Sequence, residues 1–139
     1  MKTVRDITFT IGPPGPKEEQ FKFEQFSKTS GKPPDEIWVE YVHEIFGNLS
    51  KLLPDQKMSA FDELLSRVLN TPVHIKDPFL NYTIQNGVRC PGVILYVEKI
   101  KSLNGMPLPV DWFDPKIRES IGAVFGHIFK AKWVRSYVA

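Results

Sequence analysis

The stretch DPKIRESIGAVFGHIFKAKWVRSY, residues 114–137, is the part of the chain around which the rest is organised. Asp114 can cap a helix, and Pro115 suits the first helical position because the N–H it lacks would have no partner there. At about 100° per residue the apolar side chains form one stripe, which predicts a helix over residues 115–137. The stripe consists of Ile117, Ile121, Val124, Phe125 and Ile128.

A second strip lies about a third of a turn away on the same predicted helix. It contains Gly122, Gly126, Phe129 and Trp133. Two small residues four apart allow another backbone to come close, and the two aromatic rings flank that groove. A helix that is apolar on two sides is usually packed on both. We therefore predict that these four residues bind a partner.

Length and composition indicate one soluble domain, residues 1–139. Hydrophobic residues make up 42% of the chain and charged residues 24%, and the net charge is only +2, so any nucleic-acid surface must be local. The single cysteine excludes an internal disulfide framework. No apolar run matches a signal peptide or a membrane span. We expect a cytoplasmic, intracellular protein, or a component of a virus or phage particle assembled inside a cell.

The N-terminal region predicts a β-hairpin over residues 4–26. Residues 4–11 alternate β-branched or aromatic side chains with threonine, as in a strand. A loop rich in proline and glycine follows, and then Phe21, Phe23 and Phe26 indicate a second strand. An isolated hairpin is marginal in water, so its phenylalanine face should dock on helices.

The remaining part, residues 35–138, is predicted to be helical. Apolar spacings of three and four indicate a helix over residues 36–53 and a second helix that Pro54-Asp55 opens, with its apolar stripe over residues 58–69. Ser59 and Asp62 could also cap a later start of this second helix. A short helix is expected over residues 79–86. Residues 92–103 favour a helix, although the run from 93 to 97 also suits a buried strand. The predicted fold is α+β: an N-terminal hairpin packed on four to five helices, with the long C-terminal helix at the centre.

Catalytic and metal-binding patterns are weak. Cys90 precedes Pro91 at an expected helix start, where the helix dipole and Arg89 would favour a thiolate. No histidine is near Cys90 in sequence, so a small buried residue is the simpler interpretation. The histidines lack the spacing of a helical metal site. We therefore expect no metal, no cofactor and no catalytic residues, with an enzyme built around Cys90 as an alternative.

The end of the chain is basic and aromatic. Lys130, Lys132, Trp133 and Arg135 lie close together, and residues 114–139 hold five basic but only two acidic side chains. Such a cluster can bind single-stranded nucleic acid through charge and stacking. Cations in the last turn of a helix also favour the helix dipole, so a capping or partner-binding role competes with this interpretation.

Three features favour a non-enzymatic role in protein–protein interaction. No catalytic set is visible, the last helix has two apolar sides, and the proline-rich arms at residues 12–16 and 106–112 suit extended contacts with neighbours. We therefore expect an assembly subunit of a larger complex, with a homo-oligomer or a viral component as specific forms. The two alternatives are a small nucleic-acid-binding protein and the Cys90 enzyme.

Overall fold

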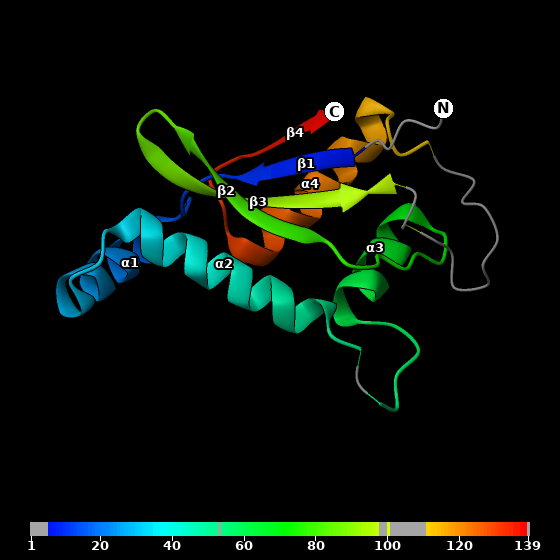
Figure 1. Cartoon of the computed structure of the whole chain (residues 1–139), viewed down its shortest axis with the longest axis horizontal. Helices are drawn as coiled ribbons and strands as arrows, with labels where there is room; N and C mark the ends of the chain where they lie inside the picture. Colours follow the sequence, from blue (N-terminus) through cyan, green and yellow to red (C-terminus); the bar gives the residue numbers. More distant parts are fainter. Residues whose placement is uncertain (1–5, 53, 98–99, 101–110, 139) are drawn as a thin grey trace.

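The chain combines four helices and a four-stranded antiparallel sheet in the residues that the computed structural model describes, which are 6–52, 54–97, 100 and 111–138 (Figure 1). This confirms the predicted α+β class. The elements follow in the order β1 (Asp6–Ile11), α1 (Lys17–Ser30), α2 (Pro34–Ser50), α3 (Ala60–Leu69), β2 (Phe79–Gln85), β3 (Val88–Tyr96), α4 (Pro115–Phe129) and β4 (Val134–Val138).

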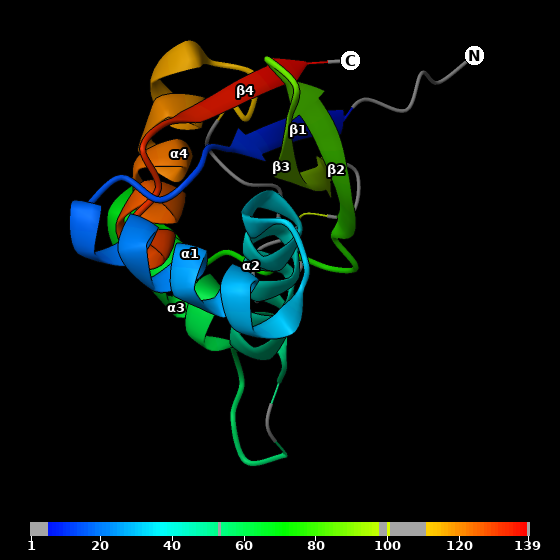
Figure 2. The same cartoon turned by 90° about the vertical axis from the view of Figure 1, so that its left-hand side faces the viewer.

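The sheet has the strand order β2-β3-β1-β4, and every neighbouring pair is antiparallel. β1 and β2 are therefore parallel to each other with β3 between them, and β3 and β4 are parallel with β1 between them. Each parallel pair is joined through helices, which is the split β-α-β arrangement used twice. The helices lie on one side of the sheet, and β2 and β4 form its opposite edges (Figure 2).

The core lies between the sheet and the helices. Cross-strand register places Ile7 opposite Leu95 and Phe9 opposite Val93 on the same face, and all four side chains are fully buried. From α4, Phe125 contacts Phe9 with ring centroids 5.2 Å apart. Alternate residues of the sheet thus face the helices, as the period of a strand requires.

The N-terminal hairpin was predicted wrongly in its second half. β1 forms a strand, although Val4 lies outside the described residues, but the run with Phe21, Phe23 and Phe26 is part of α1. The spacing from Phe23 to Phe26 fits a helix, and Glu18 and Glu19 occupy the first turn, where acidic side chains favour the helix dipole. β1 instead pairs with β3 and β4, which are distant in sequence.

The helices predicted over residues 79–86 and 92–103 were also wrong for the residues that the structure describes. They belong to β2 and β3, which form a hairpin through Asn86 and Gly87. Both turn residues have positive φ, 53° and 78°, as a two-residue type I′ turn requires. Residues 98–99 and 101–103 lie outside the described part of the chain, as does most of the expected proline-rich arm at 106–112.

The C-terminal helix ends at Phe129, eight residues before its predicted end. Lys130 adopts a left-handed conformation, with φ of 54°, and its N–H donates to the Gly126 carbonyl as a helix stop. The chain then turns back, and β4 pairs with β1, so the described residues of the region 35–138 form three strands as well as helices. α4 does begin as predicted, because the Asp114 side chain accepts a hydrogen bond from the Lys116 N–H.

Candidate partner-binding groove

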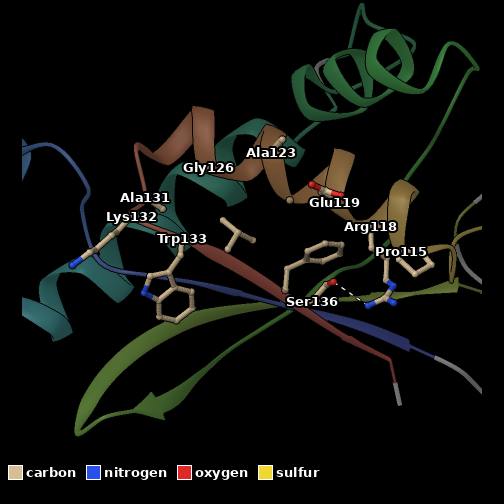
Figure 3. A pocket seen from close by; sticks show the side chains of 12 residues that line it. Pro115, Arg118, Glu119, Ala123, Gly126, Ala131, Lys132, Trp133 and Ser136 are labelled. Atoms are coloured by element: carbon tan, nitrogen blue, oxygen red, sulfur yellow. Dashed lines mark hydrogen bonds between the residues drawn. The ribbon is translucent and has the colours of Figure 1, made fainter.

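A groove of about 460 Å³ lies between α4 and β4 (Figure 3). One wall is the small-residue side of α4, formed by Gly122, Ala123 and Gly126, and the other is formed by Val134 and Ser136 of β4. The volume lies within the range of sites that hold small molecules or short peptide side chains. The chain reversal at Lys130 creates this groove, because it returns β4 alongside the helix that precedes it.

The glycine strip of α4 faces the protein's own β4. A Cβ atom added to Gly122 would lie 3.5 Å from Val134 Cγ1, and one added to Gly126 would lie 3.8 Å from Val134 Cγ2. These are ordinary contact distances, so a Cβ atom would fit at either position without displacing Val134. Both glycines line the groove beside Val134.

The two aromatic residues of the predicted strip have different surroundings. Phe129 is only 2% exposed and its ring stacks on Phe125, so its side chain belongs to the core and cannot contact a partner directly. Trp133 is half-buried and lines the groove. Its ring lies against Gly12, where an added Cβ atom would be only 2.6 Å from ring carbons. Gly12 therefore provides the space that the indole occupies.

β4 leaves one of its backbone edges unpaired within the described residues, because it is the last strand of the sheet. The Gly12 N–H donates to the Trp133 carbonyl at 2.8 Å, so Trp133 faces β1. Backbone groups alternate in an antiparallel ladder, with one residue facing its neighbour and the next facing away. The N–H and C=O groups of Val134, Ser136 and Val138 consequently point to the free edge, next to the groove.

Charged side chains lie towards both ends of the groove. Figure 3 shows Lys132 towards one end and Arg118 towards the other. Arg118 is held in place, because Nη1 donates to Ser136 Oγ at 3.0 Å and Nε donates to the Phe113 carbonyl at 3.3 Å. Lys132 is exposed. The groove therefore combines a small-residue wall and an unpaired strand edge with Lys132 towards one end and both Arg118 and the acidic Glu119 towards the other.

The side chains of the predicted nucleic-acid cluster make contacts within the chain that occupy most of them. Lys130 lies 3.5 Å from a carboxylate oxygen of Glu19, and the Arg135 guanidinium lies over the Trp133 ring at 4.4 Å. One face of the indole is thus covered by Arg135 and another part of it contacts Gly12. Stacking of a base on Trp133 would require Arg135 to move, and Lys132 is the remaining basic side chain of the cluster.

Cys90 lies inside β3 and not at a helix start, which corrects the environment expected for it. The thiol is buried, and burial raises its pKa, with the nearby Asp35 carboxylate adding to the increase. Arg89 does not supply the expected activation, because its guanidinium lies 3.5 Å from the Glu36 carboxylate. The thiol donates to the Val88 carbonyl, with sulfur and oxygen 3.9 Å apart, and has no histidine as a partner. These features are those of an inert core cysteine.

Two histidines have structural partners. His43 Nε2 donates to the Asn81 carbonyl at 2.8 Å, and burial lowers its pKa. His74 Nδ1 lies 2.9 Å from a carboxylate oxygen of Asp62, which is 2% exposed and also accepts from the Ile75 N–H. The Asp62 network was not predicted from the sequence, although Ser59 followed by Asp62 has the spacing of a helix cap. Across the described part of the chain, no three His, Cys, Asp or Glu side chains gather as metal ligands would.

No protein-family model, curated protein sequence or solved structure matches this chain. Among the helices of the described residues, none is long and apolar enough to cross a bilayer.

Proposed function

We propose that this chain is a non-enzymatic, partner-binding subunit that receives an extended segment of another protein in the groove between α4 and β4. The observation that carries the proposal is the unpaired edge of β4 beside a groove of about 460 Å³. An extended segment can add a strand to an exposed sheet edge, and pockets beside that edge then select its alternate side chains.

The chemistry of the groove defines the segment that fits. Val134, Ser136 and Val138 offer backbone groups to an added strand, which supplies affinity without regard to sequence. Gly122, Ala123 and Gly126 leave room for medium-sized apolar side chains at alternate positions of the segment. Lys132, exposed towards one end, favours an acidic residue at the end of the segment that reaches it.

The two alternative functions have less support. An enzyme based on Cys90 would need an accessible thiolate, whereas this thiol is buried with a raised pKa. Nucleic-acid binding through the basic aromatic cluster would need Trp133 free for stacking, whereas Arg135 lies over its ring and Lys130 is paired with Glu19.

A binding experiment tests the proposal directly. Random linear peptides are selected by display against the purified chain, and the affinity of each is measured for the wild type and for Ala123→Leu, which fills the groove. Because Ala123 is exposed, the substitution should not disturb the core. We expect the dissociation constant to rise about tenfold or more, which corresponds to ~1.4 kcal/mol.

Two further variants make the experiment specific. Ser136→Pro removes one outward-facing N–H from the edge of β4 and should weaken the same peptides. Gln25→Leu adds similar apolar bulk at an exposed position of α1, far from the groove lining, and should leave the affinity unchanged. Selection of no peptide, or of peptides that bind Ala123→Leu as tightly as the wild type, would overturn the proposal.

A further inference from the structure

The opposite edge of the sheet, β2, has an unusual composition for an unpaired strand. Its seven residues, FLNYTIQ, include no charged residue and no proline. Three large apolar side chains are more than half exposed: Phe79 at 52%, Tyr82 at 53% and Ile84 at 66%. Proteins usually protect such an edge with charge, proline or a covering element, because it is a template for pairing with another strand.

The backbone of β2 presents hydrogen-bonding groups to this free edge. The two-residue turn at Asn86 and Gly87 makes Gln85 and Val88 a hydrogen-bonded pair. Alternation along the ladder then directs the backbone groups of Asn81 and Thr83 towards β3 and those of Leu80, Tyr82 and Ile84 away from it. β2 is the last strand on this side, so these outward groups have no strand partner in the described chain.

We propose that two copies of this chain associate by antiparallel pairing of their β2 strands about a two-fold axis at Tyr82, the midpoint of the strand. The outward-facing residues then meet as hydrogen-bonded pairs: Tyr82 with Tyr82 of the second copy, and Leu80 with Ile84 of the second copy. This register forms about six backbone hydrogen bonds and continues the sheet from one copy into the other.

The side chains favour a second copy over an unrelated segment. In the two-fold register, apolar Leu80 lies opposite apolar Ile84 on the helix side of the sheet. On the other side, Asn81 lies opposite Thr83 of the second copy. Each of these polar residues has a buried side-chain oxygen without a hydrogen-bond partner in the described part of this chain, Asn81 Oδ1 and Thr83 Oγ1. Pairing therefore places apolar on apolar side chains at Leu80, Tyr82 and Ile84, and polar on polar side chains at Asn81 and Thr83. Only at the two ends of the strand does an apolar residue, Phe79, lie opposite a polar one, Gln85, and β2 itself contributes no charge.

The two edges of the sheet differ in the way this proposal requires. β4 carries Arg135, and Lys132 lies just before it, so self-pairing there would bring several cations together. β2 carries no such charge. Self-association through β2 also leaves the groove at the other edge open, so it is independent of the proposed binding function (Figure 2).

Sedimentation of the full chain over a concentration series tests the proposal, with the wild type compared with Tyr82→Lys. We expect a concentration-dependent dimer for the wild type. In Tyr82→Lys two ammonium groups face each other at the two-fold axis, and the dissociation constant should rise by about tenfold or more. Because Tyr82 is exposed, the variant should stay folded, which circular dichroism checks. Ile84→Lys supplies a second variant of the same edge.

A charge-complementation experiment separates edge pairing from any general loss of solubility or fold. Mixing Tyr82→Lys with Tyr82→Glu should restore a dimer, since opposite charges then face each other at the axis. Tyr137→Lys, at a similarly exposed aromatic residue of β4, should dimerise like the wild type. A monomeric wild type, a dimer insensitive to Tyr82→Lys, a failure of the mixture to associate, or loss of the dimer in Tyr137→Lys would each overturn the proposal.

Discussion

Gly12→Ala tests the contact that holds the C-terminal strand against the start of the chain. An added Cβ atom would lie 2.6 Å from two ring carbons of Trp133 and 2.9 Å from a third. The shortest of these distances is 0.8 Å less than the 3.4 Å at which ordinary contact begins. The atoms concerned belong to the fused part of the indole, so the whole ring, and not a flexible end, must move. Overpacking of this kind costs about 1–3 kcal/mol of the free energy of unfolding.

Urea unfolding measures this effect, with Gly47→Ala as the matched control. Gly47 lies within α2, and an added Cβ atom there meets no atom within 4 Å. Alanine should therefore stabilise the protein by about 0.5–1 kcal/mol through its higher helix propensity. Glycine-to-alanine substitution is thus predicted to lower the free energy of unfolding at Gly12 and to raise it at Gly47, because the surroundings of the added Cβ atom differ.

A double-mutant cycle assigns the cost to the indole. In a Trp133→Ala background the ring is gone, and Gly12→Ala should cost much less than in the wild type. If Gly12→Ala is neutral in the wild type, or costs the same in both backgrounds, then Trp133 does not lie against Gly12. The reversal of the chain after Lys130, and with it the groove, would then be incorrect.

Three further predictions concern buried polar and titratable groups. Burial lowers the pKa of His43 below 6.5, so at a pH just below 6.5 the imidazole is protonated in the unfolded chain but still neutral in the folded one. The urea midpoint of the wild type should therefore decrease as the pH falls through about 6.5, and that of His43→Gln should decrease less. Asp62→Ala should cost about 1–3 kcal/mol in urea unfolding because the buried Ile75 N–H loses its acceptor, whereas a change within error would deny the network its role. Cys90 should react with a thiol reagent slowly in the native protein and rapidly in urea, since its pKa is raised and it is buried; fast native labelling would support the enzymatic alternative.

The parts of the fold that could be predicted from sequence are those with strong local signals. β1 alternates clearly, and α2 and α3 have apolar residues at helical spacing. The start of α4 is marked by Asp114 and Pro115, which act locally through a side-chain cap and a fixed φ. In each case the signal lies within the element itself, so no knowledge of its neighbours is needed.

The errors arose where local periodicity supports two structures. The run from Val134 to Val138 contains no glycine or proline that would end a helix, yet its valine and tyrosine residues are also typical of strands, and pairing with β1 decides between the two. β3 is buried in the centre of the sheet, where a continuous apolar run cannot be distinguished from a helix by period. The Asn86-Gly87 turn is the local signal for the β2–β3 hairpin, whereas a helix over residues 79–86 was predicted there.

Because α4 was predicted to end too late in the chain, only part of the candidate groove could be predicted. Gly122, Gly126 and Trp133 were identified from sequence as a contact surface, and all three line the groove. Val134 and Ser136, which supply the unpaired strand edge, were not identified, because a helix through residue 137 leaves no edge. The residue pattern therefore indicated the small-residue wall of the groove, whereas tertiary pairing was required to find the other wall.

The central proposal is that the groove between α4 and β4 binds a partner. The most direct measurement is a pair of NMR spectra of amide groups, recorded with and without a peptide selected by display. We predict that the largest shifts fall on Val134, Ser136 and the facing residues Gly122 to Gly126 of α4, and that the amides of β2 do not shift. Shifts centred on any other surface, with the amides of β4 unchanged, would contradict it.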